Sequence, residues 1–213
     1  MRSGKVTSLD VAARAGVSQS AVSRVFTPGG SASKETVDKV RRAAAELGYR
    51  PNVLARSLIT GRSRIIGLVV AYLENQFYLD ALERLSDALQ SQGYRLMVFL
   101  AADTDPDLDR VVDELLDYQV DGIIAASVGL SDGLVTRCDA AGIPVVLFNR
   151  GHQDRRFSQI TSDNAQGAEE AARFFIAGGH QRIAQITGLA GSSTGRDREQ
   201  GFLQGLAQEG VAL

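Results

Sequence analysis

The stretch VTSLDVAARAGVSQSAVSRVF, residues 6–26, decides how the first part of this chain folds. Thr7 and Asp10 have the spacing of a capping box, in which each side chain pairs with a backbone N–H group at the start of a helix. Small and apolar residues follow as far as Gly16, a residue that is typical of a turn. The stretch therefore opens with a predicted short helix that ends at this glycine.

A second helix is predicted over residues 19–26, directly after the turn. Ser18 can cap it, because a serine oxygen accepts a hydrogen bond from the first turn of a helix. One face of this helix holds its apolar residues at intervals of three and four: Val22, Val25 and Phe26. Its other faces hold the polar residues Gln19, Ser20 and Arg24. Two short helices around a tight turn are typical of a helix-turn-helix.

A third helix is predicted between the cap Ser33 and Gly48. Its apolar residues recur at intervals of three and four: Val37, Val40, Ala44 and Leu47. The three helices together predict a compact miniature core. Residues 53–58 can form just over one more turn, which is too short to be stable alone and is expected to order only with a partner. The polar residues 60–63 then mark a domain boundary.

Charge is distributed unevenly along the chain. Residues 1–64 contain 12 Lys and Arg but 4 Asp and Glu, a net charge of +8, whereas the remainder contains 11 and 21, a net charge of −10. A basic unit joined to an acidic one suggests that only the basic unit meets a polyanion such as DNA, because counterion release drives that binding. On charge alone, a solvated basic surface explains the excess equally well.

From residue 64 onward, strand and helix patterns alternate. Residues 65–71 are continuously apolar and rich in β-branched side chains, as in a strand that is covered on both faces. Further strands, with helices between them, are predicted over 94–101, 120–127, 143–148, 159–162 and 182–187. The repeated unit predicts an α/β fold with a doubly wound parallel sheet, whose ligands bind beyond the carboxyl ends of the strands.

The composition argues against several classes of protein. Cys138 is the single cysteine, so no intramolecular disulfide forms, and its spacing to the two histidines matches no zinc site. No apolar run approaches the ~20 residues that span a bilayer, and the first residues lack the apolar region of a signal peptide. His152 and His180 have no partner at a catalytic spacing. We therefore expect a reduced, cytoplasmic protein with no metal, cofactor, membrane partner or catalytic residue.

Taken together, these residues resemble the LacI family of bacterial repressors. The resemblance covers nearly all of residues 6–67 and lies in the motifs of residues 6–18 and 22–25, Ser33-x-x-Thr36, Leu47-Gly48-Tyr49-Arg50-Pro51-Asn52 and Ala55-Arg56-Ser57-Leu58. A looser, collinear likeness follows in six motifs: Asn75-x-Phe77-Tyr78, Val120-Asp121-Gly122-Ile123-Ile124, Gly142-Ile143-Pro144-Val145-Val146, Asp163-Asn164, Gly178-Gly179-His180-x-Arg182-Ile183-Ala184 and Arg198-x-x-Gly201-Phe202. That part is similar to the family's sensor, which has the fold of type I periplasmic sugar-binding proteins.

The resemblance implies four segments. They are a helix-turn-helix DNA-binding domain over 1–50, a hinge helix and linker over 51–63, a sensor N-terminal lobe over 64–162 and part of a sensor C-terminal lobe over 163–213. The family's sensor continues well beyond this point, so we expect a small all-α domain followed by an α/β sensor whose second lobe is incomplete.

Several residues are expected to contact DNA. The second helix of a helix-turn-helix lies in the major groove, which brings Gln19, Ser20 and Arg24 to the base edges. An arginine pairs with guanine and a glutamine with adenine, each worth about 1–3 kcal/mol of discrimination. Hydroxyls near helix starts favour phosphate contacts, with plain N-capping as the alternative: Thr7, Ser18, Ser23, Ser33 and Thr36. For Ser18 and Ser33 the two roles are compatible.

The resemblance gives Leu58 a specific role. In the family, the leucine at this place is a wedge that pairs with its mate across a dimer axis and unstacks a central base step from the minor groove. Asn52, Ala55 and Arg56 are then nearby minor-groove or phosphate contacts. The alternative is that Leu58 makes a plain linker contact.

Candidate effector-binding residues follow the predicted strands. Phe77 and Tyr78 come after the first strand and offer aromatic faces for a sugar or base, although core packing explains Tyr78 equally well. Asn149 and Arg198 match positions that the family uses for its ligand, and an arginine there can donate two hydrogen bonds to hydroxyls or a carboxylate. Asp103 and Arg150 are further candidates, with a surface salt bridge as the alternative.

We therefore expect a homodimeric or larger repressor on a pseudopalindromic operator. A sugar or related metabolite between two sensor lobes would change operator affinity through differential binding to two states. An enzyme with a doubly wound fold is the first alternative, but it needs a nucleophile, metal cluster or cofactor motif that the sequence lacks. A periplasmic sugar-binding protein is the second, and the basic first unit argues against it.

Overall fold

The computed structural model divides the chain into two compact units, Met1–Thr60 and Gly61–Leu213. It describes residues 6–27, 29–51, 61–71, 73–101, 105–129, 132–152, 157–189 and 191–211. The predicted hinge helix, with Asn52, Ala55, Arg56 and Leu58, lies outside the described residues, and so does Asp103. None of the described helices is both long and apolar enough to cross a membrane.

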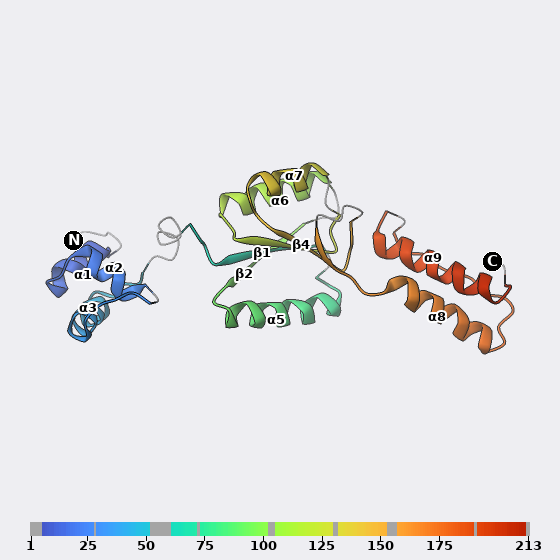
Figure 1. Cartoon of the computed structure of the whole chain (residues 1–213), viewed down its shortest axis with the longest axis horizontal. Helices are drawn as coiled ribbons and strands as arrows, with labels where there is room; N and C mark the ends of the chain where they lie inside the picture. Colours follow the sequence, from blue (N-terminus) through green and yellow to red (C-terminus); the bar gives the residue numbers. More distant parts are fainter. Residues whose placement is uncertain are drawn as a thin grey trace. The chain divides into compact units, whose positions relative to one another are not determined.

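The described part of the first unit, which we call the head, contains three helices: α1 (Ser8–Ala15), α2 (Gln19–Phe26) and α3 (Lys34–Leu47) (Figure 1). The capping box is confirmed, because the Thr7 N–H donates to Asp10 Oδ2 at 2.8 Å and the Asp10 N–H donates to Thr7 Oγ1 at 3.4 Å. Gly16 ends α1 at a φ of 66°, a left-handed conformation that glycine adopts without strain. Local sequence thus fixes both ends of the first helix.

The head has a small apolar core between its three helices. Val11, Val22 and Val40 come one from each helix and are at most 1% exposed. The rings of Phe26 and Tyr49 close one side of this core with their centroids 5.8 Å apart. This core is small, so the head has little stability to spare.

The second unit is built on a parallel sheet. Helices α5 (Gln76–Ser91), α6 (Asp105–Asp117) and α7 (Asp132–Ala140) connect its strands. Figure 1 shows α5 on one face of the sheet and α6 and α7 on the other. The strands are β1 (Ile65–Val70), β2 (Arg95–Leu100), β3 (Gly122–Ala126), β4 (Val145–Phe148) and β5 (Ser158–Ile160). Their order in the sheet is β2-β1-β3-β4-β5.

Successive residues of β1 face opposite cores, which explains its continuous apolar run. Leu68 and Val70 pack with Tyr78 of α5, whereas Val69 packs with Leu115 of α6. Cys138 of α7 also lies in the second of these cores, and its burial raises the pKa of its thiol. The predicted doubly covered strand is therefore confirmed, and the single cysteine packs as a small apolar residue.

Asp121 holds the two residues before β1 in place through hydrogen bonds. Its Oδ1 accepts hydrogen bonds from the Ser63 N–H at 2.8 Å and the Ser63 hydroxyl at 3.0 Å, and its Oδ2 accepts one from the Arg64 N–H at 3.2 Å. Arg64 has a φ of 58°, which is uncommon for a residue with a side chain, and its guanidinium lies 5.6 Å from the centre of the Tyr94 ring. The segment that leads into the sheet is thus held by a carboxylate from the start of β3.

Helices α8 (Asn164–Ala177) and α9 (Ser193–Gln208) pack against each other through Ala172, Phe202 and Leu206. Between them, residues 181–189 have no regular structure, so the strand predicted over 182–187 is wrong. An extended segment becomes a strand only when a neighbour pairs with its backbone, and no described strand does so. Ile186 in this segment is fully exposed.

Replacing Gly201 by alanine is expected to lower the free energy of unfolding by about 1–3 kcal/mol, the usual cost of overpacking. A Cβ atom at this position would lie 2.1 Å from the Ala165 carbonyl oxygen, so α8 and α9 would have to separate. Chemical denaturation followed by circular dichroism measures the effect. Gly167→Ala is the matched control, because a Cβ atom at this position would meet nothing within 4 Å. This variant should stabilise α8 slightly, since alanine favours a helix more than glycine does. Equal stability of the two variants would contradict this packing.

Candidate functional site

The polar face of α2 is open to solvent. Its four polar residues are all exposed: Gln19, Ser20, Ser23 and Arg24. The Gln19 Nε2 donates to the Ser8 hydroxyl of α1 at 3.0 Å, and the Ser18 and Ser20 hydroxyls lie 2.9 Å apart. No described carboxylate pairs with Arg24. The helix thus offers an amide, hydroxyls and a guanidinium, which are the groups that read base edges.

Hydroxyls cap all three helices of the head. Thr7 caps α1, Ser18 accepts from the Ala21 N–H at 3.2 Å, and Ser33 accepts from the Thr36 N–H at 3.2 Å. The Thr36 and Ser33 hydroxyls are 2.9 Å apart. Capping satisfies only some of the free N–H groups of each first turn, so the remaining ones can still meet an anion.

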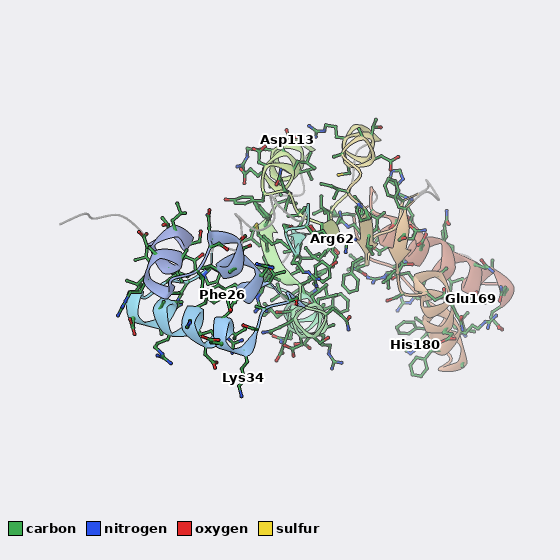
Figure 2. All side chains as sticks on the ribbon, turned by 60° about the vertical axis from the view of Figure 1, so that its left-hand side comes forward. Phe26, Lys34, Arg62, Asp113, Glu169 and His180 are labelled. Carbon is green, nitrogen blue, oxygen red and sulfur yellow. The ribbon has the colours of Figure 1, made fainter. Side chains whose placement is uncertain are left out.

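Basic side chains surround these helices. Arg14 pairs with Glu46 at 2.6 Å and Lys39 with Glu35 at 2.8 Å, and the hydrogen bond from Lys39 lowers the pKa of Glu35. Lys34 extends away from the three helices (Figure 2). Among the described residues, no acidic partner is present for Lys34, Arg41, Arg42 and Arg50. The excess positive charge of the head therefore lies on its surface.

In the second unit, three polar side chains meet at the carboxyl ends of β3 and β4. The Asn149 Nδ2 donates to the Tyr78 hydroxyl at 2.6 Å and to the Ser127 hydroxyl at 2.9 Å, and the hydroxyls of Tyr78 and Ser127 pair with each other. The structure therefore brings together the predicted residues Tyr78 and Asn149. Tyr78 is 7% exposed, so it is both part of the core and a member of this cluster.

The backbone at this edge of the sheet has an unusual conformation. Ser127 and Asn149 each follow a strand directly, and their φ angles are 56° and 70°. Such angles are strained for residues other than glycine, least so for asparagine, and they occur often at functional sites. Here they turn both side chains toward Tyr78.

An aromatic surface adjoins the cluster. Phe77 is 48% exposed and stacks on Phe148, with their centroids 5.9 Å apart and their planes at 5°. Arg150 is half-buried two residues beyond β4. Beneath α5 a void of about 10 Å³ is lined by Leu68, Tyr78 and Phe148, which is room for about one water molecule.

Arg198 does not join this cluster. Its Nε donates to the Asn164 Oδ1 at 2.7 Å, and Asn164 is 7% exposed at the start of α8. The loop after β4 nevertheless reaches α9, because the Gly151 N–H donates to the Ser193 hydroxyl at 2.9 Å. The described residues contain no group of three or more possible metal ligands.

Sequence analysis missed three residues that hold site residues in place, Ser8, Ser127 and Asn164, and it also missed Asp121, which holds the start of β1. Ser8 and Asn164 pair with Gln19 and Arg198, and Ser127 joins Tyr78 and Asn149. Asp121 lies in a quoted motif, but nothing in that motif indicates its contacts with Ser63. Of these residues, only Ser127 could have been found from the sequence. It is a polar residue at the end of an apolar strand, and this is the edge of a parallel sheet where ligands bind.

Two family models match the chain. "Bacterial regulatory proteins, lacI family" matches residues 7–52, and "Periplasmic binding proteins and sugar binding domain of LacI family" matches residues 63–213. The HTH-type transcriptional regulator AscG of Escherichia coli (strain K12) is 34% identical over 210 residues, which are 97% of this chain and 62% of that protein. The chain thus spans about three fifths of the length of this curated relative.

Two solved structures have the same fold. The lac repressor dimer bound to operator and the anti-inducer ONPF superposes with a TM-score of 0.85 at 27% identity, covering 98% of this chain and 64% of that one. The transcriptional regulator CelR–cellobiose complex gives a TM-score of 0.64 at 30% identity, covering 98% and 63%.

Proposed function

Because this chain belongs to the LacI family of bacterial regulatory proteins, we propose that it is a sequence-specific, DNA-binding transcriptional repressor controlled by a small-molecule effector. It acts on an operator in the cytoplasm and catalyses no reaction. The observation that carries it is the exposed polar face of α2, on a capped helix in a basic unit.

The proposed DNA contacts divide into three classes. Gln19, Ser20 and Arg24 read base edges in the major groove. The hydroxyls and first turns of the capped helices position the head on phosphates: Thr7, Ser18, Ser23, Ser33 and Thr36. Asn52, Ala55, Arg56 and Leu58 contact the minor groove or its phosphates. Two copies of the chain bind the two halves of a pseudopalindromic operator, since a two-fold dimer matches a two-fold site.

The effector is proposed to be a sugar or a related metabolite. CelR, one of the similar proteins, is solved with cellobiose. Phe77 offers an exposed ring on which a sugar can stack, and Asn149 and Tyr78 offer polar groups beside it. Arg198, with Arg150 and Asp103, is proposed to contact the same ligand. We assign α8 and α9 to a second sensor lobe, whose movement relative to the first would change operator affinity.

Selection of DNA sites from a random pool tests the proposed function. The full chain should enrich a two-fold symmetric site that contains a guanine and an adenine in each half. A chain that enriches no symmetric site from the pool, although it is folded by circular dichroism, would contradict the proposal.

Leu58→Ala is expected to weaken binding to the selected site by about tenfold or more, because the wedge that helps to bend the DNA is lost. Binding to unrelated DNA should stay within about twofold, since no charge is removed. Fluorescence anisotropy with the two duplexes measures both. Ser57→Ala is the neighbouring control. An equal loss on both duplexes would instead identify Leu58 as a residue needed for folding.

A further inference from the structure

Ser8 and Gln19 connect the beginnings of two helices in the head. Each is the first residue of its helix, α1 or α2, and they lie eleven residues apart in the sequence. The hydrogen bond from Gln19 Nε2 to the Ser8 hydroxyl oxygen is 3.0 Å long and lies at the surface. It is the contact that ties the outermost atoms of Gln19 to a different helix.

The Gln19 amide has enough hydrogen-bonding groups to bind Ser8 and an adenine base together. The Nε2 atom carries two hydrogens, and Ser8 takes one of them. Recognition of adenine uses the other hydrogen, as donor to N7, and the Oε1 atom, as acceptor from N6. An amide that turns its other Nε2 hydrogen toward Ser8 can make both of these contacts with adenine at the same time. The contact therefore orients the amide without using the groups that would read a base.

Orientation matters because a free glutamine side chain is flexible. An exposed glutamine has several rotatable bonds, and fixing them costs conformational entropy at the moment of binding. A side chain that is already held by a neighbour loses less entropy when it binds, so it discriminates better. Ser8, which is half-buried at the start of a capped helix, is a rigid point for this purpose.

We propose that Ser8 is a positioning residue for DNA reading, which orients the Gln19 amide toward an adenine. This inference rests on the proposed function. The binding partner of the Gln19 amide is double-stranded DNA with an adenine opposite the start of α2. Arg24 lies five residues further along α2 than Gln19, so its base preference should be independent of Ser8.

Site selection with the full chain and its variants tests this role. Gln19→Ala should abolish the adenine preference at one position of each half-site, a loss of about 5- to 150-fold. Ser8→Ala should reduce the same preference about three- to tenfold, because the amide is no longer held. Preferences at the other positions, including the guanine assigned to Arg24, should not change.

Three further variants separate positioning from other roles. Ser8→Thr keeps the hydroxyl and should keep the preference. Ser8→Ala added to Gln19→Ala should have no further effect, as expected for a residue that acts only through Gln19. Ser91→Ala is the matched control in the second unit, where the Ser91 hydroxyl donates to the Ala88 carbonyl at 2.7 Å, and it should leave all preferences unchanged.

The outcomes distinguish this inference from the proposed function. A uniform loss of affinity in Ser8→Ala over all sequences would overturn the inference, since it indicates a role in folding. An effect of Ser8→Ala that persists in the Gln19→Ala background would also overturn it, since it indicates a direct contact with DNA. If the unmodified chain prefers no sequence at all, the proposed function itself fails.

Discussion

Arg24→Ala lowers the affinity for the selected operator by about 5- to 150-fold relative to unrelated DNA. An arginine can donate two hydrogen bonds to guanine O6 and N7, and such a pair is worth about 1–3 kcal/mol of discrimination. Arg24 is exposed on α2, and none of the described carboxylates holds it in another contact. Fluorescence anisotropy with the selected and a scrambled duplex, at one salt concentration, gives the ratio of the two Kd values.

Two control variants separate the recognition of a base by Arg24 from the simple loss of a positive charge. Arg42→Ala removes an equal charge from α3 and should lower both affinities together, because phosphate contacts are blind to sequence. Arg24→Lys keeps the charge but loses the two-pronged geometry, so it should recover only part of the discrimination. If Arg24→Ala and Arg42→Ala behave alike, Arg24 is a phosphate contact and the assignment is wrong.

Val40→Asp abolishes binding to every DNA sequence. Val40 is completely buried between the three helices, where an unpaired carboxylate costs several kcal/mol. A unit of this size has a total stability of only about 3–9 kcal/mol, so the head should unfold. Hydrogen exchange measures this directly: amides of α3 should lose protection, while amides of β1 keep theirs, because β1 packs in cores of its own.

Ala45→Asp is the matched control for the added charge. Ala45 is exposed on the same helix, so the same substitution should leave the head folded and reduce DNA affinity only slightly. A protected α3 in the Val40→Asp variant would show that the small core does not hold the head together.

Features that depend on neighbouring residues were predicted well from the sequence. Thr7, Ser18 and Ser33 were predicted as caps, and each caps its helix, because a cap satisfies a donor only three residues away. The continuous apolar run of β1 predicted a strand covered on both faces, and the two cores on either side of it confirm this. Local geometry leaves few alternatives in such cases.

Individual side-chain contacts between residues that are distant in the sequence were not predicted. The contacts Tyr78–Ser127 and Ser63–Asp121 join residues 49 and 58 positions apart, and no periodicity in the sequence indicates them. The strand over 182–187 was wrong for a related reason, since its apolar pattern is real but strand formation needs a paired neighbour. The strained conformations of Ser127 and Asn149 also depend on the surrounding structure.

The ratio of two dissociation constants tests the assignment of this chain as a reader of DNA sequence most directly. The full chain is titrated into the duplex selected from the random pool and into a scrambled duplex of the same composition, both at about 150 mM salt. Specific binding predicts a Kd ratio of about 10³ or more, typical of operator-binding proteins. Equal Kd values for the two duplexes would contradict it and would reduce the basic head to a general polyanion-binding surface.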